Sequence, residues 1–215
     1  MDILLISGVL KKYGDWHDIW HQSKVPFEAL RIILYFLEGI FNNLRMILPK
    51  RVVINLNARE IPNYWPGKCF GCSRTNTHGL QLRFWLTEKG CYTRCSIPDH
   101  LCGIDGVVHG GIITLLLEEV AQWTIISHFG KFGMTREISV RYLKPVSTNT
   151  EILVEAQITN QSEKNILFRS TVHNSEGILL TESESNWMFA SPAAISRATA
   201  VDESMLREFL AKYSQ

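Results

Sequence analysis

A short stretch of the chain combines a glycine-rich turn with acidic residues inside an apolar run. The turn is His109–Gly111, and the apolar run that follows it carries Glu118, Glu119 and Gln122. The free N–H groups of a helix's first turn, together with the helix dipole, favour a carbonyl or another partly negative group. A carboxylate in an apolar wall has a raised proton affinity, which suits a general base near neutral pH. We therefore expect chemistry here, although a turn that simply needs glycine and a glutamate bonded across an interface would give the same pattern.

The helical repeat determines which of these side chains share a face. Glu118 and Gln122 are four residues apart and lie on one face of a helix. Glu119 is rotated by about 100° from Glu118 and points elsewhere. Only one of the two glutamates can therefore easily face a given cavity.

The apolar pattern divides the chain into three regions. Residues 1–60 form an N-terminal extension, in which an apolar stripe over residues 26–48 predicts a long helix. We expect this helix to pack on its own domain or on a dimer mate, and a peripheral membrane contact is the alternative. Residues 61–192 are strand-rich around one helix, and residues 193–215 form a short helical tail.

The middle region predicts a sheet that is wrapped around a buried helix. The helix spans about residues 110–128, and Gly130 is a suitable end for it. Turn residues separate the expected strands, which span residues 80–86, 91–97, 136–144, 151–158, 166–173 and 178–189. Short connections between strands favour antiparallel pairing. We therefore expect an α+β fold in which a curled antiparallel sheet surrounds one long central helix.

Composition and charge exclude several classes of protein. The 215 residues include 22 basic and 21 acidic side chains, so nothing favours nucleic acid as a partner. No apolar run reaches the length that a membrane-spanning helix needs. No secretory signal precedes the five cysteines, and we expect reduced thiols and a cytoplasmic location.

Two of the cysteines form a Cys-x-x-Cys pair whose role the sequence leaves open. The pair is Cys69 and Cys72, and it could bind zinc, act in redox chemistry or form a structural turn. The other side chains that could complete a set of zinc ligands are His78, Cys91, Cys95 and Cys102. Because no second close pair with the usual spacing exists, we favour the structural turn and expect no metal.

Three ordered segments resemble the hotdog-fold acyl-CoA thioesterases of the phenylacetate-pathway type. Asp105–Glu119 resembles the family's signature, in which a His-Gly-Gly turn precedes the central helix. Cys69–Phe84 resembles the entry to the first strand, and Tyr142–Val146 resembles the end of the strand that follows the helix. The resemblance covers about residues 66–190 and does not extend to residues 1–60.

This resemblance implies an assembly and a mechanism. Hotdog subunits pair edge to edge, as homodimers or tetramers, and the active sites form at the dimer interface. Gly110 and Gly111 match the turn that holds the thioester carbonyl, and His109 matches the histidine before it. Glu118 matches the catalytic carboxylate, usually an aspartate, which comes from the partner subunit and acts as base or nucleophile. The expected enzyme hydrolyses acyl-CoA and needs no cofactor beyond the coenzyme A of its substrate.

Three further helix residues complete the expected site. We assign Thr114, Gln122 and Trp123 to substrate binding, with Trp123 in the core or in the acyl pocket. Two alternatives share the fold. A 3-hydroxyacyl dehydratase would use His109 and Glu118, although the histidine of those proteins does not belong to a His-Gly-Gly turn. A binding protein would hold acyl-CoA or another lipophilic ligand and catalyse nothing.

Overall fold

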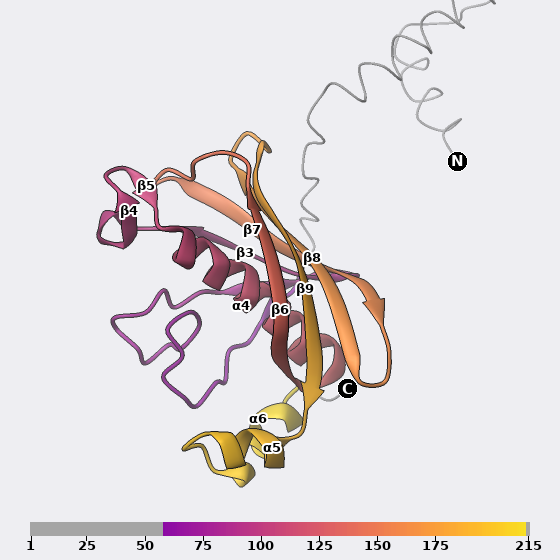
Figure 1. Ribbon diagram of the computed structural model, residues 1–215. Coiled ribbons are helices and arrows are strands. Elements are labelled where there is room, and N and C mark those ends of the chain that lie inside the picture. Colours follow the sequence, from indigo (N-terminus) through magenta and orange to yellow (C-terminus); the bar gives the residue numbers. More distant parts are fainter. Residues whose placement is uncertain (1–57, 214–215) are drawn as a thin grey trace, which may run out of the picture. The chain divides into compact units, whose positions relative to one another are not determined.

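The computed structural model describes residues 58–213, and within them a curled sheet holds one long helix (Figure 1). In this described part, seven strands form the sheet in the order β1-β2-β3-β7-β8-β9-β6, and all neighbours are antiparallel. The strands are β1 Glu60–Ile61, β2 Phe84–Leu86, β3 Gly90–Ser96, β6 Phe132–Tyr142, β7 Glu151–Gln161, β8 Asn165–Asn174 and β9 Leu179–Ala190. This arrangement confirms the expected hotdog fold.

The predicted helix over residues 26–48 lies outside the described residues. The chain divides into two compact units, Met1–Pro49 and Lys50–Gln215, and every described residue belongs to the second unit. Among the described residues, none of the helices has the length and apolar character needed to cross a membrane.

The central helix is α4, Gly110–Phe129, and it is buried over much of its surface. It ends at Gly130, whose φ of 57° lies in the left-handed region that glycine adopts without strain. The N–H of Gly130 donates to the carbonyl of Ile126 and closes the last turn. The side chains that α4 buries are Ile113, Leu116, Leu117, Val120, Ala121, Trp123, Thr124, Ile125 and Ile126.

The long strands bury alternate side chains against α4. In β8, the inward positions are Ile166, Phe168, Ser170 and Val172, as the two-residue period of a half-buried strand requires. β6 lies at one edge of the sheet and pairs only with β9 within the described chain. One side of its backbone is therefore free to pair with another strand.

Two predicted strands differ from the observed ones at their ends. The strand expected over residues 80–86 is reduced to β2, because Gln81 has a φ of 49° that an extended strand cannot contain. The strand expected over residues 136–144 begins earlier, at Phe132, because its pairing with β9 starts there opposite Ala190.

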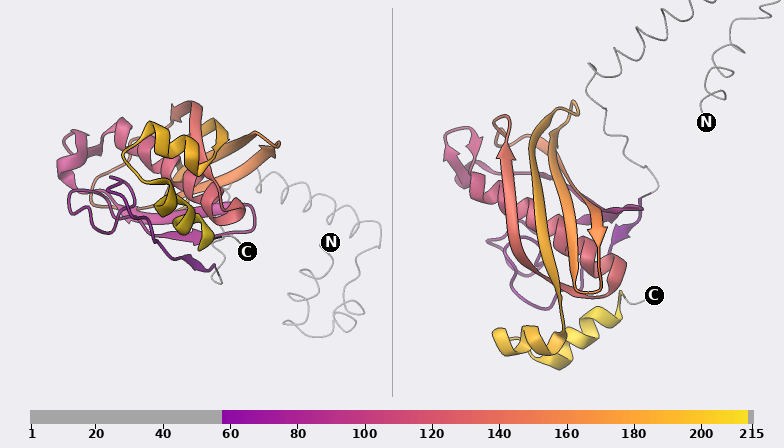
Figure 2. Two further views of the ribbon diagram at one scale, coloured as in Figure 1. Left: turned by 90° about the horizontal axis from the view of Figure 1, so that it is seen from below. Right: turned by 45° about the vertical axis from the view of Figure 1, so that its right-hand side comes forward.

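Smaller elements lie at the two ends of α4. At its start, the short helix η1 Asp99–Leu101 and the hairpin of β4 Cys102–Ile104 and β5 Val107–Val108 lead into the His-Gly-Gly turn. After β9, the helices α5 Pro192–Ala198 and α6 Glu203–Ala211 lie near the other end of α4 (Figure 2). Phe209 of α6 packs there against Trp123, with ring centroids 6.3 Å apart.

Candidate active site

The first turn of α4 is capped by its own histidine. Nδ1 of His109 accepts a hydrogen bond from the N–H of Gly111 at 2.9 Å, so the imidazole takes the place of the usual capping oxygen. In the described part of the chain, the N–H of Gly110 has no hydrogen-bond partner. The sequence assigns the same role to both glycines, but their N–H groups differ. The N–H of Gly110 is free to bind a ligand, whereas the N–H of Gly111 is bonded within the turn.

Tyr142, at the end of β6, lies over this turn. Its Oη donates to the carbonyl of Gly110 at 3.0 Å and lies 2.8 Å from Oγ1 of Thr114. Thr114 also donates to that carbonyl, at 3.1 Å. The sequence predicts Tyr142 only as part of the strand-end motif Tyr142–Val146, and this motif is the signal from which its place in the site could have been predicted. The contacts tie the helix start to the edge strand.

Glu118 lies two turns further along α4, on a face that the sheet does not cover fully. Its side chain is half-buried and has no hydrogen bond or ion pair with another described residue. Thr114, Leu115 and Gln122 are also only partly buried, so the open face runs along the helix. Gly110 and Glu118 are eight residues apart, about 12 Å along the axis, which exceeds the reach of a glutamate side chain. Within one chain they cannot contact the same carbonyl.

Gln122 and Trp123 lie where they support the fold. Oε1 of Gln122 accepts the N–H of Gly133 at 3.3 Å, so this side chain links α4 to the beginning of β6 rather than to Glu118. Trp123 is only 1% exposed and stacks on Phe84 with ring centroids 5.1 Å apart. Of the two places expected for Trp123, the structure has it in the core, so a contact with substrate would require that core to open.

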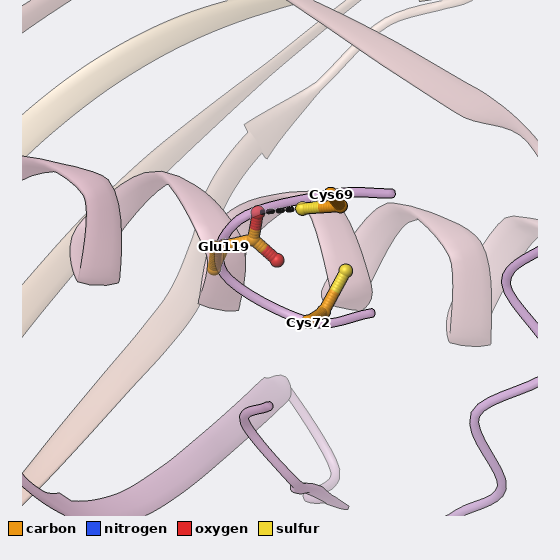
Figure 3. A group of neighbouring side chains, drawn as sticks. All are labelled: Cys69, Cys72 and Glu119. Atoms are coloured by element: carbon orange, nitrogen blue, oxygen red, sulfur yellow. Dashed lines mark hydrogen bonds between the residues drawn. The ribbon is translucent and has the colours of Figure 1, made fainter. Parts of the chain in front are cut away.

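Glu119 lies beside the Cys-x-x-Cys turn, and its carboxyl group faces the two thiols (Figure 3). The Cys69 thiol donates to its Oε1 at 3.0 Å. Burial, and then the charge of Cys69, raise the pKa of Glu119 to about 8. The hydrogen bond between the two thiols lowers the pKa of Cys69 and raises that of Cys72. The predicted rotation of Glu119 away from Glu118 is confirmed. Its contact with the cysteine thiols could not be predicted from helical spacing.

Comparisons with known proteins concern the family and the fold of the chain. The family model of the Thioesterase superfamily matches residues 105–181, from just before the His-Gly-Gly turn to the start of β9. No curated protein matches the chain. The family match supports the expectation of a hydrolase that acts on thioesters.

Several solved structures are similar to the chain. A hypothetical thioesterase of Streptococcus pneumoniae, solved with coenzyme A, is 17% identical, and the match covers 51% of this chain and 85% of that one with a TM-score of 0.48. A thioesterase of Haemophilus influenzae is 19% identical over 55% and 85% of the two chains, with a TM-score of 0.49. The PaaI protein of Escherichia coli is 12% identical over 52% and 80%, also with a TM-score of 0.49. Because these sequence identities and TM-scores are low, we assign the fold from the strand order and the central helix of this chain.

Proposed function

We propose that this protein hydrolyses acyl-CoA thioesters at a site shared between two subunits. The observation that carries the proposal is the N–H of Gly110 at the start of α4, which has no acceptor among residues 58–213. Glu118 supports it, because this half-buried side chain on the open face of the same helix has no partner in the part of the chain that the structure describes. Because one chain cannot bring these two groups to one carbonyl, the carboxylate comes from the second subunit.

The chemistry follows from the roles of the two groups. The carboxylate of Glu118 takes a proton from a water molecule, whose oxygen attacks the thioester carbonyl carbon. Negative charge develops on the carbonyl oxygen and is stabilised by the N–H of Gly110 and by the positive end of the α4 dipole. The tetrahedral intermediate collapses when the C–S bond breaks, and coenzyme A leaves as a thiolate that takes the proton which Glu118 received from the water molecule. His109 orients the turn through its bond to Gly111.

The edge strand β6 supports the assembly. It has 11 residues, it pairs on one side only with the strands that the structure describes, and Met134 and Tyr142 on it are 45% and 53% exposed. An antiparallel edge pairs naturally with a second copy of itself about a twofold axis. We therefore propose a homodimer joined through β6, with a tetramer as a further assembly, and its mass can be measured by light scattering after gel filtration.

The activity can be tested on short, medium, long and aromatic acyl-CoAs, with release of the coenzyme A thiol as the signal. We expect turnover that is abolished in Glu118→Gln and retained in Glu163→Gln, which changes an exposed carboxylate in the β7–β8 turn. An absence of turnover combined with tight acyl-CoA binding would leave the binding protein as the function. Hydration of an enoyl thioester, lost in both His109→Ala and Glu118→Ala, would instead identify a dehydratase.

A further inference from the structure

The Cys-x-x-Cys turn and the middle of α4 together form a compact group of potential metal ligands. Sγ of Cys69, Sγ of Cys72 and a carboxylate oxygen of Glu119 all lie within 4.8 Å of one another. Figure 3 shows the two thiols and the carboxyl pointing toward one another from two segments far apart in the sequence. Cys72 is 6% exposed, and Cys69 and Glu119 are half-buried.

The fold alone leaves this carboxyl poorly satisfied. Oε1 of Glu119 accepts from the Cys69 thiol, whereas Oε2 is buried and makes no hydrogen bond of ordinary geometry with a described residue, although the Cys72 thiol lies close enough to lower the pKa of this carboxyl. A buried polar atom without a partner is costly, and most native structures avoid it. A bound cation would satisfy the free oxygen.

The spacing of the three groups fits such a cation. Three atoms that are all within 4.8 Å of each other have a common point no farther than about 2.8 Å from each. Zinc lies about 2.3 Å from thiolate sulfur and about 2.0–2.2 Å from carboxylate oxygen, so a contraction of about half an ångström closes the site. Gly71 permits this approach, because a Cβ there would lie 2.5 Å from Cδ of Glu119.

We propose that Cys69, Cys72 and Glu119 bind a thiophilic divalent cation of the Zn²⁺ class. The two sulfur ligands favour such an ion over Mg²⁺ or Ca²⁺, which prefer oxygen. The three side chains leave a fourth position for water or a small ligand. The third ligand is a glutamate from the helix, whereas the sequence had suggested only histidine and further cysteines as partners of the pair.

The bound ion would fix the turn at residues 69–72 to the helix at the position next to Glu118. Binding displaces the protons of the thiols and of the carboxyl, so affinity rises with pH. The inference rests on the described ligands alone and does not depend on the proposed hydrolysis of thioesters.

The test is a titration of the full chain with Co²⁺ after dialysis against a chelator in the presence of a reductant. We expect a thiolate-to-cobalt charge-transfer band that saturates at about one Co²⁺ per chain and is removed by Zn²⁺. Cys69→Ser and Glu119→Gln should weaken binding at least about tenfold. The matched control is Cys95→Ser, which removes a half-buried thiol of β3 outside the cluster and should bind as the unchanged chain does.

Three results would overturn the inference. The first is the absence of the charge-transfer band in the folded, reduced chain. The second is equal loss of binding in Cys69→Ser and Cys95→Ser, with circular dichroism showing that both are folded. The third is a Cys69–Cys72 disulfide in the protein purified without reductant, together with no metal uptake after its reduction.

Discussion

Replacing His109 separates a capping role from a chemical one. His109→Ala removes the 2.9 Å bond from the Gly111 N–H to Nδ1, and the loss of such a cap costs about 0.5–2 kcal/mol of unfolding free energy. His109→Asn restores a side-chain acceptor at the same position, because asparagine is among the best capping residues. We therefore expect urea unfolding to show a loss of about 1 kcal/mol for alanine and little loss for asparagine.

The activity of the same two variants should follow their stability. Removing one oxyanion donor outright lowers kcat by about 10²–10³, and loosening the turn that holds Gly110 should cost less than that. We expect His109→Ala to lose between a few fold and about 10²-fold in kcat, and His109→Asn to recover most of it. An asparagine variant that is as stable as the unchanged chain but as inactive as the alanine variant would refute the capping role. It would show that the imidazole itself takes part in the reaction.

Two further predictions concern the sheet. Gly90→Ala should lower the unfolding free energy by about 1–3 kcal/mol or more, because its Cβ would lie 1.9 Å from the backbone oxygen of Ala156 on the neighbouring strand; a change in urea unfolding below about 0.5 kcal/mol would contradict this. Hydrogen bonding to Arg169, and then the charge of Arg141, hold the pKa of Glu182 below its usual 4.5. The ion pairs of Glu182 with these two arginines therefore stabilise the fold above pH 4.5, and this stabilisation is lost as the pH falls below that value. Glu182→Gln should thus lose up to about 1 kcal/mol at neutral pH and progressively less as the pH falls below 4.5, and a loss that does not change with pH would rule out the ion pairs as the cause.

The fold could be predicted where the periodicity of apolar residues determines which side chains are buried. The inward positions of β8 and the apolar run of α4 each follow one favourable period, and the turns between the elements are marked by glycine and asparagine. In β9 the buried positions include Thr181, Ser183 and Ser185, so burial there does not follow from apolar residue type. The shortened β2 could not be predicted, because the left-handed φ of Gln81 leaves no trace in residue type.

Only those features of the site that depend on the spacing of neighbouring residues could be predicted. The His-Gly-Gly turn and the opposite directions of Glu118 and Glu119 follow from helical geometry. The partner of Glu119 is Cys69, 50 residues earlier in the chain, and only the tertiary fold brings the two together. The difference between Gly110 and Gly111 depends on the rotamer of His109, which the sequence does not specify.

Mixing two inactive variants tests the shared site most directly. Gly110→Pro removes the free N–H. The backbone of proline suits the first position of a helix after an extended residue such as His109, with φ −61° and ψ 134°, and Tyr142 must shift slightly because a Cβ at Gly110 would lie 3.3 Å from its Oη. Glu118→Gln removes the carboxylate from the other half of the site. After the two variants are unfolded together and refolded, half of the dimers are mixed and each carries one intact site. A shared site predicts that the mixture has about a quarter of the unchanged chain's acyl-CoA hydrolysis. A mixture as inactive as either variant alone, although mass analysis shows that mixed dimers have formed, would contradict it.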